Sequence, residues 1–305
     1  MRRALLIAPA LVLGAAALGL EEFYRFTFCR EGSPLLNRLL DKKGHEADYY
    51  EKRDAAAERL RRRPQERMSL RSARGEKLAG FYFPMRGEGK RIAFIVHGYR
   101  SEHAETAGLY ADYYESRGFD LFCCDHTAHG ESEGRLIGFD LFEAADCLLW
   151  IEALRRRFGE DVQIVLHGFS MGAATVMKMS ADCPGNVKLI VADCGYADAQ
   201  RQLAGQFGPL YPPLRLLHRL IAGVDLRDGD VRPSLRRSRI PILIVHGRLD
   251  KTVPFENAPE LFACARSEKD CLYVENARHV ESMYAAPEAY AARLDAMIGK
   301  TVRTE

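Results

Sequence analysis

A serine stands between two glycines at the end of an apolar run, in the segment VLHGFSMGAA at 165–174. Gly168 and Gly172 permit a tight strand-to-helix turn, and a serine at the tip of such a turn presents its hydroxyl as a nucleophile. The chemistry expected of Ser170 is therefore acyl transfer, in which its oxygen attacks a carbonyl carbon. The same pattern also occurs in turns where the serine is incidental, so other residues must decide between the two interpretations.

Acyl transfer by serine needs a histidine that accepts its proton and a carboxylate that orients the histidine. Asp250 lies in VHGRLDKTVP at 245–254, and His279 lies in VENARHVES at 274–282. Each follows a predicted strand, and the chain order Ser, Asp, His is one that serine hydrolases use. Asp193 also ends a predicted strand and is a rival for the acid, but we favour Asp250 because its loop follows the later strand.

The elements that would position these side chains are apolar strands separated by helices. Uninterrupted Val, Ile and Leu runs alternating with helical stretches predict an α/β fold with a mostly parallel sheet covered on both faces. Right-handed crossovers then place the functional residues at the carboxyl ends of the strands. The predicted strands are 91–98, 119–125, 162–168, 187–195, 241–247 and 271–276, preceded by an antiparallel hairpin within 67–84.

An interval at 197–239 interrupts this alternation with the helical, apolar sequence QFGPLYPPLRLLHRLIAG. We expect a small helical lid above the strand ends. Its apolar side chains are candidates for the wall of a substrate pocket over Ser170, although an amphipathic lid helix must bury one face in any case. The candidates are Phe207, Tyr211, Leu214 and Leu217, together with Leu210, Leu220 and Ile221.

From about Arg67 to Ile298 the sequence resembles α/β-hydrolase fold proteins, close to the monoacylglycerol-lipase-like and serine-aminopeptidase-like esterases. The motifs that carry the resemblance are IVHGY (95–99), DHTAHGES (125–132), GFSMG (168–172), VHGRLDKTVP (245–254) and RHVES (278–282). The resemblance implies an α/β-hydrolase domain at 65–305 with the lid as an insertion, and a chemistry that needs no cofactor.

Residue by residue, the resemblance implies that Ser170 is the nucleophile, Asp250 the acid and His279 the general base. It also implies an oxyanion hole made of the backbone N–H groups of Tyr99 and Met171. The expected activity is hydrolysis of carboxylic esters with short to medium acyl chains through an acyl-enzyme. The alternatives are an aminopeptidase, a lipid or acyl-protein hydrolase, and a catalytically silent binding module on the same fold.

One loop departs from the family pattern. Many relatives have Asp-x-Arg-Gly-His-Gly-x-Ser, whereas this chain has His126, Thr127 and Ala128 before His129. We expect His126 and His129 to shape the loop rather than to bind a metal, because no cluster of acidic or histidine residues faces them at ligand spacing.

The N-terminal 30 residues form a separate segment. Two arginines precede an apolar stretch from Ala4 to Leu20, and aromatic residues follow in EEFYRFTF. The stretch is slightly shorter than the about 20 residues that usually span a bilayer. We expect an uncleaved membrane anchor with interfacial aromatics at 23–28; a cleaved signal peptide, with secretion, and a soluble helix are the alternatives. A polar stretch at 31–64 without an apolar stripe is expected to form a solvated connecting helix that ends at Pro64.

Composition excludes several function classes. With a net charge of +2, 28% charged and 47% hydrophobic residues, the chain is an ordinary folded protein with no expected nucleic-acid or acidic partner. The eight cysteines show no metal-binding spacing, and we expect most of them to be reduced. The expected partners are a small or lipid-like ester and, through the N-terminal segment, a membrane; the sequence does not indicate an oligomeric state.

Overall fold

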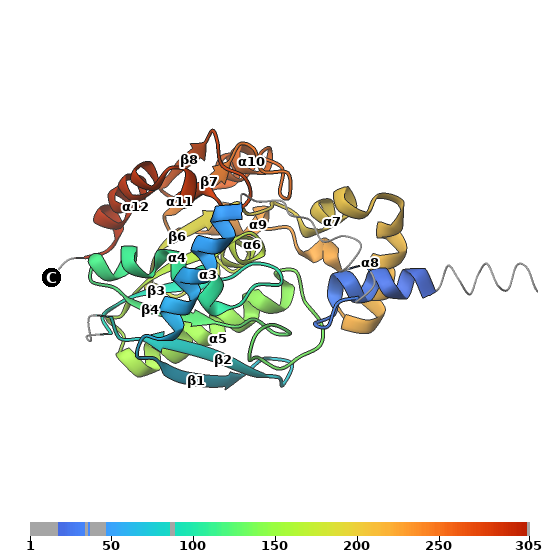
Figure 1. Ribbon diagram of the computed structural model, residues 1–305, viewed down its shortest axis with the longest axis horizontal. Helices are drawn as coiled ribbons and strands as arrows, with labels where there is room; N and C mark the ends of the chain where they lie inside the picture. Colours follow the sequence, from blue (N-terminus) through green and yellow to red (C-terminus); the bar gives the residue numbers. More distant parts are fainter. Residues whose placement is uncertain (1–17, 34–35, 37–46, 86–88, 304–305) are drawn as a thin grey trace, which may run out of the picture.

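A computed structural model describes residues 18–33, 36, 47–85 and 89–303. An eight-stranded sheet runs through the centre with helices on both faces (Figure 1). The strand order is β1-β2-β4-β3-β5-β6-β7-β8. The strands are β1 (Glu66–Arg71), β2 (Lys77–Phe83), β3 (Arg91–Val96), β4 (Asp120–Cys124), β5 (Gln163–Phe169), β6 (Val187–Asp193), β7 (Ile242–Gly247) and β8 (Lys269–Val274).

The sheet is parallel from β4 to β8, and the β1–β2 hairpin adds two antiparallel strands at one edge. The predicted α/β architecture is therefore confirmed. Continuous apolar runs arise because successive residues of a strand point to opposite faces and both faces are buried. In β3, Ile92 and Phe94 join one hydrophobic cluster, whereas Ala93 and Ile95 join the other.

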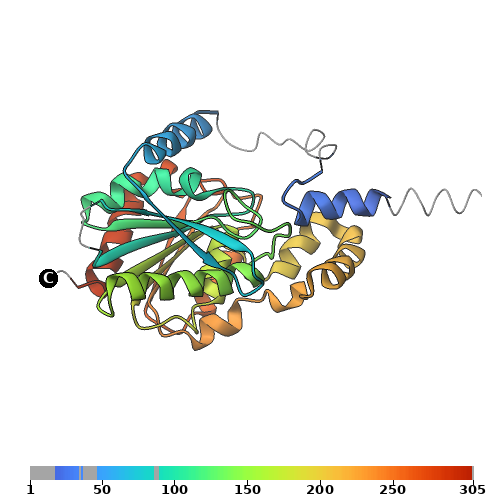
Figure 2. The same ribbon diagram turned by 90° about the horizontal axis from the view of Figure 1, so that it is seen from below.

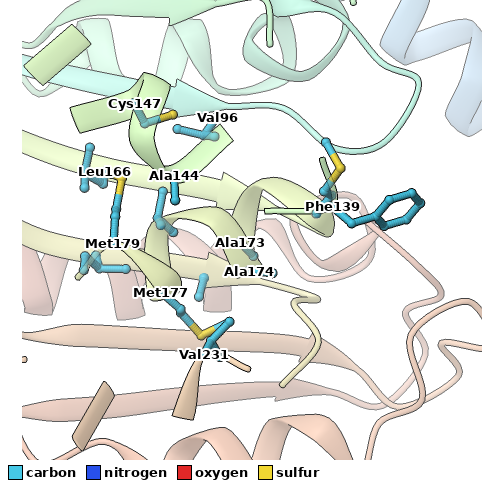
Figure 3. Packing of buried hydrophobic residues seen from close by; sticks show 14 of the residues in the cluster. Val96, Phe139, Ala144, Cys147, Leu166, Ala173, Ala174, Met177, Met179 and Val231 are labelled. Carbon is cyan, nitrogen blue, oxygen red and sulfur yellow. The ribbon is translucent and has the colours of Figure 1, made fainter. Parts of the chain in front are cut away.

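Helices cover both faces of the sheet. One face carries α4 (His103–Ser116) and α12 (Pro287–Thr301), and the other carries α5 (Leu141–Phe158), α6 (Met171–Lys178) and α10 (Asn257–Cys264). Small residues of α6 pack closely under the strands, as Ala173 and Ala174 do in Figure 3. The insertion contains α7 (Ala199–Phe207), α8 (Tyr211–Ala222) and α9 (Arg232–Arg237), and α11 (Ser282–Ala285) precedes α12.

Helix α3 (Ala47–Arg61) differs from the expected solvated connector. It lies along α4 (Figures 1 and 2) and buries Tyr49, Ala57 and Leu60. The two helices approach so closely that a Cβ at Gly108 of α4 would lie 2.7 Å from the backbone of Ala56. Because alanine and glycine carry much of this contact, α3 shows no apolar stripe in the sequence.

The N-terminal segment is described only from residue 18 onward, so residues 1–17 of the predicted anchor or signal lie outside the described part. Within the described ranges, no helix has both the length and the apolar composition needed to cross a membrane. Residues 18–28 form a helix beside α8 (Figures 1 and 2).

The prediction that the aromatic side chains of residues 23–28 lie at a membrane interface is wrong for Tyr24 and Phe28. Both side chains are buried in the core of the protein, with 4% and 1% exposure. The Phe28 ring stacks on His218 of α8 at 4.2 Å between centroids. Through these contacts Tyr24 and Phe28 pack the helix 18–28 against the insertion.

Candidate active site

The serine of the Gly-x-Ser-x-Gly segment occupies a strained turn. Ser170 is the single residue between β5 and α6, with φ 53° and ψ −116°. A non-glycine residue at positive φ is strained and is held there by its surroundings; here the Ser170 N–H donates to the Asp193 carbonyl at 2.9 Å. A Cβ at Gly172 would collide with the backbone carbonyls of Val96 and His97, so only glycine lets α6 begin this close to β3.

Three side chains from distant parts of the chain form a continuous line of hydrogen bonds. His279, in the loop after β8, donates from Nδ1 to Asp250 Oδ2 at 2.7 Å and accepts at Nε2 from the Ser170 hydroxyl at 2.8 Å. We infer this tautomer from the carboxylate, which can only accept. The geometry brings together all three residues predicted for the triad. It can transfer a proton from the serine oxygen to the imidazole.

The loop after β7 holds Asp250 as a carboxylate. Its Oδ1 accepts from the backbone N–H groups of Thr252 and Val253 at 2.8 and 2.9 Å. Burial by itself would raise the pKa of Asp250, but the hydrogen bonds from His246 and His279 outweigh it and hold the pKa well below the usual range. Asp250 therefore stays charged and keeps the proton of His279 on Nδ1.

Asp193, the rival acid, has other partners. It is fully buried at the end of β6 and accepts from the Tyr290 hydroxyl at 2.9 Å and from Ser282 at 3.4 Å. Burial raises its pKa to about 6. No hydrogen bond joins Asp193 to His279 in the described part of the protein.

Two backbone N–H groups beside Ser170 remain available. Met171 opens α6, where the first N–H groups of a helix have no intrahelical acceptor. Tyr99 follows Gly98, whose Cβ position would lie 3.3 Å from Ser170 Cβ. Among the described residues, neither N–H has a hydrogen-bond acceptor. Such free donors can stabilise an oxyanion that forms beside the serine.

Hydrogen bonds join the loop that carries Tyr99 to the end of the helix 18–28. The Tyr99 hydroxyl shares its single proton between the carbonyls of Phe26 and Thr27, at 3.0 and 2.9 Å. Arg100 reaches the same helix end and donates to the Cys29 carbonyl at 3.0 Å. The last carbonyls of a helix need such donors, and a cation there is favourable. Residues outside the family resemblance thus support the loop next to Ser170.

The pocket at Ser170 has a volume of about 190 Å³ and is lined by side chains that the sequence did not indicate. Tyr49 and Arg53 come from α3, and Glu105 and Leu109 come from α4. The predicted lining by the insertion is wrong for this pocket. The four candidates of the insertion, Phe207, Tyr211, Leu214 and Leu217, are absent from its wall.

The insertion uses its apolar side chains elsewhere. Leu214 is fully buried in the core, and Tyr211 is 7% exposed. Phe207 packs edge-on against Phe23 at 6.5 Å between ring centroids, and Leu217 lines a groove beside Tyr24. The helix 18–28 therefore occupies the face of the insertion that we expected to cover Ser170.

The atypical loop after β4 is held by neutral histidines. His126 N–H donates to His97 Nε2 at 3.0 Å, and the Arg100 N–H donates to His129 Nε2 at 3.1 Å. Burial lowers the pKa of His97 and lowers that of His129 to about 3, so both rings accept as neutral imidazoles. Their bonds join this loop to the loop of Tyr99 and Arg100.

Two groups outside the triad contain metal-ligand side chains close together. One is Cys124, His126 and Cys147, and the other is Glu102, His103 and Asp125. Burial raises the pKa of both thiols, so they are protonated and poor ligands. Asp125 already accepts from the N–H groups of His103 and Glu131 at 2.9 and 2.7 Å. The donors of both groups therefore match a folded loop better than a metal centre.

Comparisons with known proteins find relatives of the chain by sequence and by structure. A family model described as "Serine aminopeptidase, S33" matches residues 87–224. The Bacillus subtilis protein YqkD is 24% identical over 294 residues, which is 92% of each chain. Mouse monoglyceride lipase is 26% identical over 251 residues, covering 69% of this chain and 82% of the lipase.

Solved structures share the fold. The Pyrococcus furiosus esterase Pf2001 superposes with a TM-score of 0.63 at 20% identity, covering 79% of this chain and 92% of the esterase. Acetyl xylan esterase 1 from Thermoanaerobacterium has a TM-score of 0.55 at 16% identity, covering 83% and 95%. The resemblance to α/β-hydrolases is thereby confirmed. The YqkD match covers 92% of the chain, so it includes part of the 66 N-terminal residues that precede the resemblance expected from Arg67.

Proposed function

We propose that this chain, which resembles α/β-hydrolases in sequence and fold, is a serine hydrolase that cleaves carboxylic esters through an acyl-enzyme. The observation that carries the proposal is the hydrogen-bonded line from Ser170 through His279 to Asp250. A silent binding module would have no need of a strained serine together with a correctly oriented imidazole and carboxylate.

The proposed reaction has two halves. Ser170 Oγ attacks the ester carbonyl while His279 Nε2 takes its proton, and the N–H groups of Tyr99 and Met171 stabilise the oxyanion. The imidazolium, stabilised by Asp250, then protonates the leaving alkoxide, and the acyl group stays on Ser170. A water molecule then attacks the acyl carbon while His279 Nε2 takes one of its protons. The bond from the acyl carbon to Ser170 Oγ breaks, His279 returns the proton to Oγ, and the acid is released. The chemistry uses only these groups and needs no cofactor.

The pocket supports short acyl groups as substrates. Its volume of about 190 Å³ is below the about 300–1,000 Å³ of pockets that bind drug-sized ligands. Leu109 and Phe169 offer apolar wall, whereas Arg53 and Glu105 bring charge to the same pocket. A chain of many methylenes would have to cross this polar part, so we expect short esters to react best.

The test is hydrolysis of p-nitrophenyl esters of increasing chain length by the wild type and by Ser170→Ala. We expect kcat/KM to rise over the first few methylenes, by up to about tenfold or more each from 1–3 kcal/mol, and then to fall. Ser170→Ala, with unchanged thermal stability, should retain no saturable turnover. Equal turnover by the variant would refute the proposal, and a rate that keeps rising to long chains would refute the short-acyl assignment.

Aminopeptidase activity is a second candidate on the same triad. It is favoured by the description of the matching family model and by Glu105, a carboxylate in the pocket that could receive a substrate ammonium group. Against it, Glu105 already accepts from Ser101 at 3.0 Å and lies 3.7 Å from Arg53. Aminoacyl p-nitroanilides assayed beside the esters distinguish the two, and higher kcat/KM for the anilides would make this an aminopeptidase.

A further inference from the structure

The insertion exposes apolar side chains on its outer face, which we define as Leu210, Leu216, Leu220 and Ile221. Their exposures are 40%, 57%, 74% and 51%. Among the described residues seven large hydrophobic side chains are exposed, and four of them form this face. The sequence around them adds exposed prolines at 209, 212 and 213. Single exposed leucines are common, but a group of this kind on one short helical unit marks an interaction site.

The outer face is not the buried side of an ordinary amphipathic helix. The inner side of α8 already buries Tyr211, Leu214, His218 and Ala222. A helix at a protein surface normally turns polar residues to solvent opposite its buried stripe. Helix α8 instead has leucine and isoleucine on the outside as well, with Arg219 as its exposed charge there. Nothing within the described structure covers these side chains.

The helix 18–28 lies beside α8 and extends the apolar surface. Both views place the two helices together at the end of the molecule beyond the strands (Figures 1 and 2). Leu18, at the start of the described chain, is 66% exposed. Between the helices lies a groove of about 730 Å³, with Leu20, Leu217 and Ile221 on its apolar wall. Its charged lining residues are two arginines and two glutamates, at positions 25, 135, 21 and 31.

We propose that the outer face of the insertion docks on the surface of a glycerophospholipid bilayer. The chain enters the described structure at Leu18, directly after the 14 residues ALLIAPALVLGAAA at 4–17, which contain no charged side chain. An apolar sequence of this kind partitions into lipid, and it leads directly to the exposed Leu18. The adjoining Arg25 and Arg219 match lipid phosphates. A second protein copy would not account for the apolar sequence that leads into this face.

The surface does not depend on the proposed esterase activity. It gives a folded part of the protein a membrane contact, in addition to any contact made by the apolar residues of 1–17. Two contacts separated along the chain fix an orientation on the bilayer, which a single terminal segment does not. The insertion, rather than the pocket at Ser170, then faces the lipid.

The single tryptophan of the chain, Trp150, is 1% exposed and gives a constant background for a fluorescence test. We would place a reporter on the outer face with Leu220→Trp and, separately, Leu216→Trp in the full chain. The purified proteins are mixed with phosphatidylcholine–phosphatidylglycerol vesicles, with and without bromine on the acyl chains. Matched controls are Leu149→Trp and Leu249→Trp, which replace leucines that are 38% and 51% exposed elsewhere.

We expect the emission of Leu220→Trp and Leu216→Trp to shift to the blue and to fall at least twofold more with brominated lipid than that of the two controls. Circular dichroism and the melting temperature confirm that all four variants are folded. Quenching no stronger than in the controls, in vesicles that carry bound protein, would overturn the proposal. A blue shift that depends on protein concentration and not on bromine would also overturn it, and would identify a second copy as the occupant.

Discussion

The exchange Asp250→Asn isolates the role of the carboxylate that faces His279. In the folded protein one oxygen of Asp250 accepts two backbone N–H groups and the other accepts the imidazole Nδ1–H. An asparagine would keep its oxygen on the two backbone donors, because its amide nitrogen cannot accept them. The NH₂ group would then face Nδ1, so the imidazole must move its proton to Nε2. In that tautomer His279 cannot accept the proton of Ser170.

The expected loss is about 10⁴-fold in kcat, by analogy with the corresponding exchange in other serine hydrolases. At 1.36 kcal/mol for each factor of ten this is about 5.4 kcal/mol of transition-state stabilisation. Asp250 does not line the pocket, so KM should change little. The side chain keeps two backbone hydrogen bonds, so the variant should remain folded.

The assay is steady-state hydrolysis of p-nitrophenyl butyrate, with kcat and KM determined separately and folding followed by circular dichroism. Asp193→Asn is the matched control, because Asp193 is also buried but accepts hydrogen bonds from Tyr290 and Ser282. The control should alter stability and leave kcat within about tenfold. A folded Asp193→Asn without activity, beside an active Asp250→Asn, would refute the assignment of the acid.

Three further outcomes are expected. Gly172→Ala should abolish activity and lower the melting temperature. Gly205→Ala, with open space around the new Cβ, should instead stabilise the protein by about 0.5–1 kcal/mol. Equal melting temperatures of the two variants would contradict the close packing of Gly172 against β3. Tyr99→Phe, which removes the hydroxyl bonded to the helix 18–28, should lower kcat at unchanged KM, and a change in KM alone would argue against support of the oxyanion loop. Burial raises the pKa of Glu143 to about 7, so the folded state binds more protons than the unfolded state between about pH 4.5 and 7 and stability falls as the pH rises. Between pH 6 and 8 the unfolding free energy of Glu143→Gln, measured by urea titration, should therefore fall by about 1 kcal/mol less than that of the wild type. An equal fall in both proteins would contradict this.

The sheet and the position of the candidate site could be predicted because their signals are local. Each central strand is an uninterrupted apolar run, and Ser170, Asp250 and His279 each lie just past the end of a strand. In a parallel sheet these ends meet at one edge, so sequence position was enough to place the three residues together.

The covering elements could not be predicted in the same way. Helix α3 reaches α4 through Ala56, Ala57 and Gly108, which give no hydrophobic periodicity. In the insertion, residues such as Leu214 indicated that a face would be buried but not against which partner. That partner, the helix 18–28, adjoins a sequence that resembles a membrane segment, which made Tyr24 and Phe28 look interfacial.

Covalent labelling with a fluorophosphonate tests the central claim most directly, because the probe reacts with an activated serine and not with ordinary hydroxyls. We expect one probe per wild-type chain, recovered by mass spectrometry on the peptide that contains Ser170. Folded Ser170→Ala should remain unlabelled, and His279→Ala should be labelled far more slowly. A folded wild type that does not react, or that reacts at another residue, would contradict the account and leave the protein a binding module on a hydrolase fold.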